Sequence, residues 1–255
     1  MTFSRRFFAL LLFGTVSVNA APLQVASDEW CPFNCKPADD KPGYVIELLQ
    51  AIFAEEGIDY RVLPWKRAVL QIQRGETAAG IGATKDTAEA EKLQIGQESI
   101  GDISDCLFVP ANSAVRYQGR ADDLNSLKRV GVSLGYKYFE GFAEWLQRPE
   151  NKVKVFTASG DDPAAFNLRK LSAGALDGVI ETEAVMNYML LNAGLDTQFV
   201  SVGCDTPTPI YVAFGPNNIQ SDTLVKQFDQ GIAELRKTGR LAEILTRYGL
   251  KDWKH

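Results

Sequence analysis

The chain has 255 residues, of which 45% are hydrophobic and 23% are charged, and its net charge is −5. These values are typical of a folded globular protein and exclude a disordered or fibrous one. The sequence contains no block or stripe of basic residues, so we do not expect a nucleic-acid partner.

The first twenty residues have the pattern of a secretory signal peptide. Arg5-Arg6 forms the positive segment, residues 7–18 form the apolar core, and residues 18–20 give a small-residue cleavage pattern. The apolar core is too short for a permanent membrane anchor. The arginine pair is also compatible with twin-arginine export, and this alternative stays open. The sequence therefore predicts an exported, soluble, periplasmic protein.

The chain contains four cysteines, Cys31, Cys35, Cys106 and Cys204. An even number of cysteines in an oxidising compartment is typical of disulfides, and four cysteines allow three pairings. Cys31 and Cys35 are close in the sequence, so we favour Cys31–Cys35 and Cys106–Cys204. A redox or metal site is the alternative, but the spacing is not CxxC and the single histidine is His255. We therefore expect no metal and no cofactor.

The first half of the chain alternates strand and helix patterns. The expected strands cover residues 23–26, 60–63 and 78–82, and the expected helices cover residues 45–53 and 65–72. Residues 86–105 are polar and acidic with few apolar anchors, and we expect a loop with short helical turns there.

The stretch from Ile58 to Thr84 reads as a strand, a helix and a second strand. In open α/β sheets, the loops at the carboxyl ends of the strands form the ligand-binding edge. Trp65, Arg67 and the loop after the second strand should therefore face a common cleft.

The pattern restarts in the second half of the chain. The expected strands cover residues 106–109, 129–133, 153–156, 177–180, 199–202 and 210–214. Asp161 or Asp162 is expected to cap a helix that has Pro163 in its first turn. The arrangement of Ile72 and Gly75 before a strand recurs at Leu171 and Gly174, which favours two similar lobes over one continuous sheet.

Several segments, taken in order, resemble the bacterial extracellular solute-binding proteins of family 3, the group that includes the polar amino-acid receptors. The segments are Trp30-Cys31-Pro32-Phe33, Gly43-Tyr44-x-x-Glu47-Leu48, Pro64-Trp65-x-Arg67-Ala68, Leu171-x-x-Gly174-x-x-Asp177 and the ending from Lys237 to Gly249. No single segment is decisive, but their order is specific and they extend over essentially the whole chain beyond the signal segment.

The resemblance implies an α/β fold of the type II periplasmic-binding-protein class. It has two lobes, each a mostly parallel sheet flanked by helices, joined by two hinge strands that close on a small ligand. The first lobe would combine residues 22–109 and 212–255, and the second would comprise residues 110–211. The implied function is capture of a small ligand by a monomer, for an ABC-type importer with an inner-membrane permease. The aromatic residues expected at the cleft favour a small polar or aromatic, cationic metabolite as that ligand.

One departure from the family pattern concerns the ligand. Amino-acid receptors of this family carry Thr-x-x-Arg after the central strand, and that arginine clamps the carboxylate of the ligand. Here Thr87 is followed by Ala90 at the arginine position. A methyl group does not replace a planar two-pronged donor, although Lys85 or Arg67 could compensate.

The candidate ligand-binding residues are those expected at the cleft edge of either lobe. They are Trp30, Phe33, Trp65, Arg67, Ala83, Thr84, Lys85, Tyr136, Tyr138 and Glu181. Each also has a structural interpretation. Trp65 belongs to an apolar helix stripe, Phe33 could pack around the Cys31–Cys35 ring, and Glu181 could cap the following helix.

Two other functions remain open besides transport. A sensor or adaptor read by a membrane receptor would have the same lobes. A dehydratase-like enzyme on the same fold is the less favoured alternative, because the lobes offer no histidine, no nucleophile elbow and no phosphate loop. We therefore expect a binding protein and not an enzyme.

Overall fold

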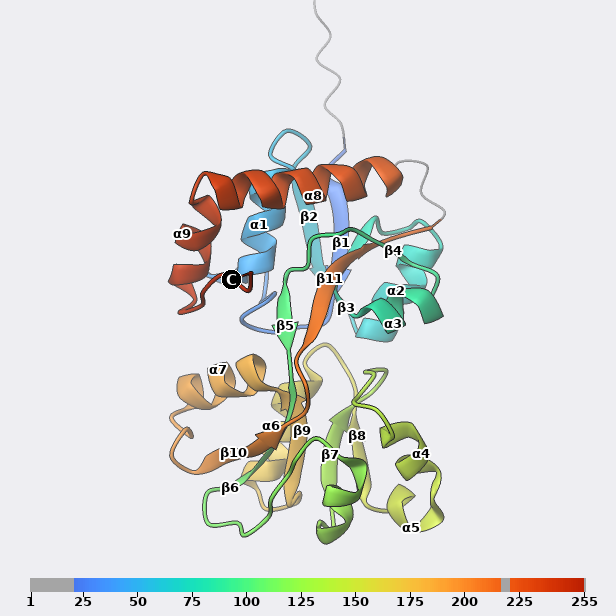
Figure 1. Cartoon of the computed structure of the whole chain (residues 1–255), viewed down its shortest axis with the longest axis vertical. Helices are drawn as coiled ribbons and strands as arrows, with labels where there is room; N and C mark the ends of the chain where they lie inside the picture. Colours follow the sequence, from blue (N-terminus) through green and yellow to red (C-terminus); the bar gives the residue numbers. More distant parts are fainter. Residues whose placement is uncertain (1–20, 217–220, 255) are drawn as a thin grey trace, which may run out of the picture.

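A computed structural model describes residues 21–216 and 221–254. The predicted signal segment, residues 1–20, lies outside the described residues. The described chain forms two lobes that are joined by two crossings, and each lobe has its own sheet with helices packed on it (Figure 1). None of the helices in the described part of the chain has the length and apolar character needed to cross a bilayer.

The first lobe contains a six-stranded sheet with the order β2-β1-β3-β11-β4, in which β5 pairs with β11. Its strands are β1 (Leu23–Ser27), β2 (Ile58–Val62), β3 (Ala79–Ala83), β4 (Gln94–Ile95), β5 (Gly101–Ile103) and β11 (Thr208–Phe214). Its helices are α1 (Tyr44–Ile52), α2 (Trp65–Gln73), α3 (Lys85–Ala90), α8 (Ser221–Lys237) and α9 (Arg240–Arg247). The expected loop at residues 86–105 thus contains most of α3 and the short strands β4 and β5. These strands have no apolar pattern of their own, and it is their pairing with β11 that makes them part of the sheet.

The second lobe contains a five-stranded sheet with the order β10-β6-β9-β7-β8. Its strands are β6 (Asp105–Pro110), β7 (Val130–Ser133), β8 (Val155–Ala158), β9 (Gly178–Thr182) and β10 (Phe199–Cys204). Its helices are the 3₁₀ helix η1 (Ala121–Ser126), α4 (Phe142–Gln147), α5 (Pro149–Lys152), α6 (Pro163–Ser172) and α7 (Glu183–Ala193). Asp162 caps α6, because its side chain accepts a hydrogen bond from the backbone N–H of Ala165 at 2.9 Å.

Both sheets are mixed. β1 pairs parallel with β2 and β3, and β7 pairs parallel with β8 and β9. The strands next to the crossings, β6, β10 and β11, add antiparallel pairs, because the chain enters each lobe there in the opposite direction. The loops after β1, β3, β7 and β9 meet between the lobes, where they surround the cavity described below.

The lobes contact one another. The main apolar core of the first lobe includes Leu48, Leu49 and Phe53, all fully buried, between the sheet and helices α1, α8 and α9. The same cluster includes Ala164 of α6 and Val185 of α7, which belong to the second lobe. The structure therefore describes a closed arrangement.

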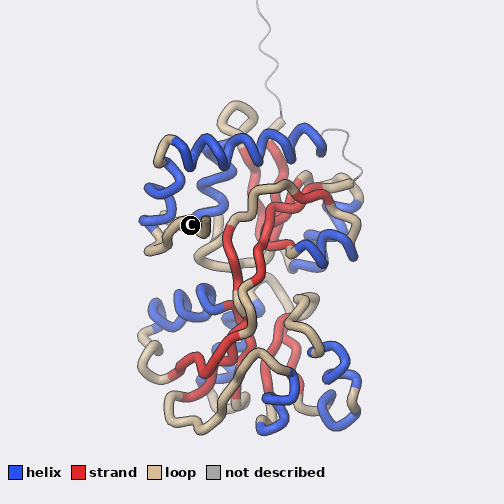
Figure 2. The backbone as a smooth tube through the Cα atoms, in the orientation of Figure 1, coloured by secondary structure: helices blue, strands red, loops and turns tan. Residues whose placement is uncertain are grey.

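The two crossings run side by side at the centre of the molecule (Figure 2). Pairing changes from the first sheet to the second between Ile103 and Asp105, and it changes back between Cys204 and Thr208. Each change comes a few residues before the predicted lobe boundary, because β6 pairs entirely within the second sheet and β11 entirely within the first.

Disulfides join Cys31 to Cys35 and Cys106 to Cys204, which is the pairing favoured from the sequence. Cys106 in β6 and Cys204 in β10 are register partners immediately beside the crossings.

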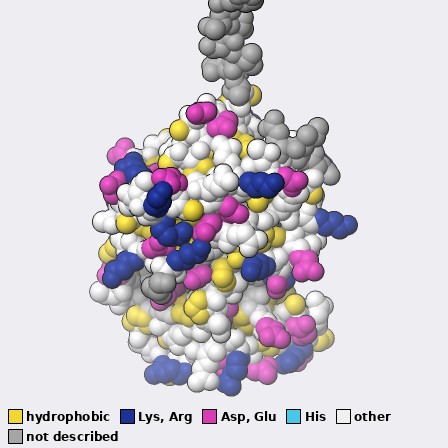
Figure 3. All heavy atoms as spheres, turned by 45° about the horizontal axis from the view of Figure 1, so that its top comes forward, with side chains coloured by type: hydrophobic (Ala, Val, Ile, Leu, Met, Phe, Trp, Pro, Cys, Tyr) yellow, Lys and Arg dark blue, Asp and Glu magenta, His cyan; other side chains and the backbone are white. Residues whose placement is uncertain are grey.

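On the face in Figure 3, basic and acidic side chains are interspersed, so that face has no extended field of one sign.

The two disulfides should differ in their contribution to stability. Cys106–Cys204 closes a loop with a sequence separation of 98, whereas Cys31–Cys35 has a separation of 4. The chain-entropy model gives about 4–5 kcal/mol for the long loop and about 2 kcal/mol for the short one. We expect the double variant Cys106→Ser, Cys204→Ser to lose more free energy of unfolding in urea than Cys31→Ser, Cys35→Ser. Equal losses, or a larger loss for the short ring, would contradict this ranking.

Candidate functional site

A small cavity lies where the loops of the two lobes face each other. Its volume is about 50 Å³. The first lobe contributes the loops after β1 and β3 and the start of α2, and the second lobe contributes the loop after β7 and the end of β9. The lining residues are Asp28, Trp30, Trp65, Ile81, Gly82, Thr84, Thr87, Ile103, Asp105, Tyr136, Lys137 and Thr182.

Trp30 forms an aromatic wall of this cavity. Its ring stacks on Phe33 with 4.3 Å between the ring centroids, and Phe33 packs in turn against Tyr44 in the core. The ring also lies against Gly82, where an added Cβ would be only 2.9 Å from Trp30 Cζ3 and where φ is +96°. A side chain at residue 82 would therefore displace Trp30. Phe33 is 3% exposed and supports Trp30 from behind without lining the cavity itself.

Two hydrogen bonds join the lobes through buried carboxyl groups. Tyr136 Oη, from the second lobe, donates to Asp28 Oδ2 of the first at 2.7 Å. Trp30 Nε1, from the first lobe, donates to Glu181 Oε1 of the second at 3.4 Å. The two pairs run in opposite directions across the gap, so each lobe supplies one donor and one acceptor.

Asp28 and Glu181 are buried without a cation. Glu181 is 1% exposed; its Oε1 also accepts from the backbone N–H of Thr182 at 2.9 Å, and its Oε2 has no hydrogen-bond partner. Burial raises the pKa of Asp28 to about 7, against the opposing hydrogen bond from Tyr136. Burial likewise raises the pKa of Glu181 to about 7, although the hydrogen bonds from Thr182 and Trp30 act in the other direction.

Two further carboxyl groups lie at the crossings. The backbone N–H of Asp105 donates to Asp205 Oδ1 at 2.7 Å. The pKa of Asp105 is raised well above its ordinary value by burial and then by the charges of Asp205 and Glu181. The pKa of Asp205 is also raised, again by burial.

A larger polar cavity of about 570 Å³ lies beside the small one, next to the crossings. The two cavities share the lining residues Thr84, Ile103, Asp105 and Lys137. The larger one is also lined by Lys85, Asp86, Gln118, Gly119, Tyr138, Phe139, Glu140, Asp205, Thr206, Thr208 and Pro209. The two cavities therefore adjoin between the lobes, and their walls extend from Trp30 to Asp205.

The predicted residues occupy three kinds of position. Trp30, Trp65, Thr84 and Tyr136 line the small cavity, and Glu181 is hydrogen-bonded to Trp30 at its wall. Lys85 and Tyr138 line the larger cavity. The remaining three are Phe33 behind Trp30, Ala83, which is buried at the end of β3, and Arg67, which is exposed on α2 and is not among the residues lining either cavity.

The residues missed from the sequence are mainly acidic. Asp28 is in the aromatic loop that the sequence singled out, but nothing local distinguishes it from Glu29. Asp105 and Asp205 belong to segments 100 residues apart that meet only at the crossings. Lys137 lies between the two predicted tyrosines and forms an ion pair with Asp86 of the first lobe at 3.1 Å.

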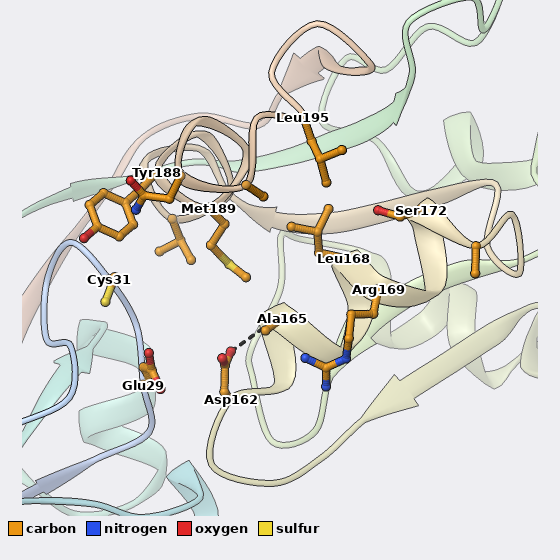
Figure 4. Close-up of a pocket in the computed structure, with 14 residues that line it drawn as sticks. Glu29, Cys31, Asp162, Ala165, Leu168, Arg169, Ser172, Tyr188, Met189 and Leu195 are labelled. Atoms are coloured by element: carbon orange, nitrogen blue, oxygen red, sulfur yellow. Dashed lines mark hydrogen bonds between the residues drawn. The ribbon is translucent and has the colours of Figure 1, made fainter.

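A further hollow of about 720 Å³ lies on the flank of the second lobe, between α6 and α7 (Figure 4). Its walls are mostly apolar and include Leu168 of α6 and Met189 of α7. Glu29 and Cys31 of the first lobe complete it, and the backbone N–H of Glu29 donates to the carbonyl of Asp161 at 2.8 Å. This hollow therefore spans both lobes but is separate from the polar interlobe space.

Within the described residues, one group of potential metal ligands comes together, formed by Cys106, Glu183 and Cys204. The two cysteines are joined in a disulfide and offer no thiolates. This group therefore does not fit a metal ion.

Comparison with known proteins gives a family and a fold. The family model of the bacterial extracellular solute-binding proteins, family 3, matches residues 23–251. An ancestral arginine-binding protein bound to arginine superposes with a TM-score of 0.75 at 18% identity, covering 90% of this chain and 99% of that one.

Two other solved structures extend the comparison. A histidine kinase sensor domain with similarity to periplasmic binding proteins gives a TM-score of 0.72 at 20% identity, covering 90% of this chain and 96% of that one. The arginine-, lysine-, histidine-binding protein ArtJ of Geobacillus stearothermophilus gives 0.70 at 17% identity, covering 89% and 94%. No curated protein matched the chain by sequence. The fold is thus the two-lobed, type II periplasmic-binding-protein fold predicted from the sequence.

The buried carboxyl groups predict a pH-dependent opening. The pKa values of Asp28 and Glu181 are raised from 3.8 and 4.5 to about 7 in the closed form, so between those values the closed form holds protons that an open, hydrated cleft would release. Opening of the ligand-free protein is therefore favoured as the pH rises toward 7, by at most about 3 to 4 kcal/mol per carboxyl. We expect the radius of gyration in X-ray scattering to be larger at pH 8 than at pH 5.5.

A matched variant identifies the groups responsible. Asn and Gln at these positions do not titrate, so Asp28→Asn, Glu181→Gln should show a smaller change of radius between the two pH values. The same change in the double variant, or none in the wild type, would show that these carboxyl groups do not control opening.

Proposed function

Because the chain belongs to the bacterial extracellular solute-binding proteins, family 3, we propose that it is an exported periplasmic protein that captures a small organic cation between its lobes and delivers it to an ABC-type importer in the inner membrane. In this proposal the lobes hinge at the two crossings and close over the ligand. The observation that carries it is the pair of buried carboxyl groups, Asp28 and Glu181, set among aromatic side chains with no cation beside them.

The aromatic lining of the small cavity and the carboxyl groups beside it both favour a cation. Its walls include Trp30, Trp65 and Tyr136, whose ring faces attract a positive charge. An ionised carboxylate in a buried site is costly unless it is paired, so Asp28 and Glu181 gain most from an ammonium group. Glu181 Oε2 is buried without a partner and is available to accept a hydrogen bond.

The same features disfavour a free amino acid. Ala90, at the position of the family's carboxylate-binding arginine, is exposed on α3 and is not among the residues that line the small cavity. The carboxylate of an amino acid would instead lie near Asp28 and Asp105. We therefore propose weak or no binding of glutamine, glutamate and arginine, whatever the ligands of similar proteins are.

The cavity in the closed structure is smaller than a metabolite needs. About 50 Å³ holds a few water molecules, whereas ligand sites are typically 300–1,000 Å³. Binding therefore requires Tyr136 to leave Asp28, or a ligand that extends into the larger polar cavity. Either way, ligand would shift the open and closed populations through contacts with both lobes.

A sensor function is the second candidate, because the superposition includes a histidine kinase sensor domain. A sensor would use the same cleft and the same closure, and its closed form would be read by a membrane receptor instead of a permease. The fold supports both. Affinity capture with a solubilised permease complex, with and without ligand, separates the importer function from signalling.

The test of the binding site is calorimetry with small organic cations. Choline and butylamine are suitable probes, with glutamine, glutamate and arginine as comparisons. We expect Glu181→Gln to weaken cation binding at least about 30-fold, because truncating one partner of a buried charge pair costs about 2 kcal/mol or more.

Arg67→Gln is the matched control for that substitution. Arg67 was predicted from the sequence to contact ligand, but it is exposed on α2 away from both cavities. It should leave the affinity unchanged. If Arg67→Gln weakened binding and Glu181→Gln did not, or if the wild type bound glutamine with submicromolar affinity, the site would have been assigned to the wrong residues.

A further inference from the structure

Four carboxyl groups form a row through the interlobe space. They are Asp28 after β1, Glu181 at the end of β9, Asp105 at the start of β6 and Asp205 after β10. Asp105 and Glu181 lie on paired neighbouring strands, with Cys106 opposite Glu181, and Asp105 is hydrogen-bonded to Asp205 through its backbone. The charges of Asp205 and Glu181 both act on Asp105, and that of Asp28 acts on Glu181. The row is thus continuous.

No cation compensates this row. In the part of the chain that the structure describes, none of the four carboxyl groups is within ion-pair distance of a lysine or arginine. The two lysines that line the larger cavity have other contacts. Lys137 pairs with Asp86 at 3.1 Å, and Lys85 lies over the ring of Tyr211 at 5.9 Å.

An unpartnered buried oxygen gives an independent sign of a ligand at one end of the row. Glu181 is 1% exposed, yet its Oε2 has no hydrogen-bond partner, while Oε1 is held by Trp30 and Thr182, which both line the small cavity. Leaving such an oxygen unsatisfied is unfavourable in a protein interior. A donor supplied from the cavity would satisfy it.

The two cavities provide a path along the row. They share four lining residues, and Asp105 is one of them, so the cavity lined by Asp28 adjoins the cavity lined by Asp205. Aromatic side chains accompany it, with Trp30 and Tyr136 at one end and Tyr138 and Phe139 at the other. An apolar chain could pass along these rings while charged groups reach the carboxyl groups at each end.

We propose that the ligand is a linear diamine or polyamine, with one ammonium group held by Asp28 and Glu181 and a second held by Asp105 and Asp205. This inference rests on the proposed function and narrows its ligand class. A monoamine would neutralise only the end at Trp30 and would leave Asp105 and Asp205 without a counter-charge. An amino acid would bring a carboxylate into a row that already consists of carboxylates.

A single metal ion fits the row less well than two separate ammonium groups. Calcium and magnesium require oxygen ligands that converge on one point. Among the described residues, only Cys106, Glu183 and Cys204 bring three potential ligand atoms within 4.8 Å of one another, and none of the four carboxyl groups belongs to that group.

The experiment compares amines of equal chain length by calorimetry at pH 8, which is above the pKa of about 7 of Asp28 and of Glu181. The probes are unbranched α,ω-diamines with three to six carbons, and propylamine to hexylamine as their monoamine partners. We expect the best diamine to bind at least about 100-fold more tightly than the monoamine of the same length. The series also reports which spacing of the two ammonium groups fits the row.

Variants at the two ends separate the two ammonium positions. Asp205→Asn keeps an oxygen that can accept from the backbone of Asp105, and it should weaken the diamine at least about 10-fold while changing the monoamine little. Asp28→Asn should weaken both amines. Asp122→Asn, at an exposed carboxyl on η1 that lines neither cavity, is the control and should change neither. Thermal melts of each variant check that it is folded.

The outcomes distinguish this inference from the proposed function. If monoamines and diamines bind equally and Asp205→Asn has no effect, the inference that the ligand carries two ammonium groups is wrong. The proposed capture of an organic cation would still stand. If no amine binds and an amino acid does, both are wrong. A thermal shift with calcium chloride that exceeds the shift with every diamine, and that is lost in Asp105→Asn, would show that the row binds a metal ion and not a diamine.

Discussion

The closed arrangement depends on removing two carboxyl groups from water. Tyr136 covers Asp28 and Trp30 covers Glu181, and each pair joins one lobe to the other. The hydrogen bonds offset only part of the lost hydration, which is why both pKa values rise to about 7. Near neutral pH, the interface between the lobes is therefore held by groups that exchange a proton easily.

A proton and a cationic ligand compete for the same carboxyl groups. With protons bound, the lobes can meet without a buried charge, and with an ammonium group bound they can meet with the charge paired. The ionised, empty cleft is the state that favours separation of the lobes. Closure is thus coupled to positive charge, whichever species supplies it, and the affinity for a cation should increase as the carboxyl groups lose their protons.

The sequence predicted the order of the elements well because most of them carry local signals. The apolar stripe of α2, the Asp162 cap of α6 and the glycines that follow helices are all readable over a few residues. The cleft-edge loops followed from the same reasoning, since strand ends meet at one edge of a sheet. This is why Trp30, Trp65 and Tyr136 were predicted and line the small cavity.

The acidic row could not be predicted in the same way. Asp105 lies in an acidic stretch that suggests a solvated loop, and the other three carboxyl groups of the row come from three distant segments. Arg67 shows the opposite difficulty: it is two residues from Trp65, but 3.6 residues per helical turn direct the two side chains to different sides. Local patterns identify which loops approach the cleft, whereas tertiary pairing decides which side chains face it.

The disulfide beside the crossings also has a mechanical consequence. Cys106 and Cys204 are register partners, and the sulfur bridge connects the chain entering the second lobe to the chain leaving it. Tension applied between the two termini would pass through that bridge and bypass the segment between the cysteines, which are 98 positions apart. The second lobe is thus a covalently closed insertion that carries no load, so stretching the chain would extend the first lobe and leave the second lobe folded.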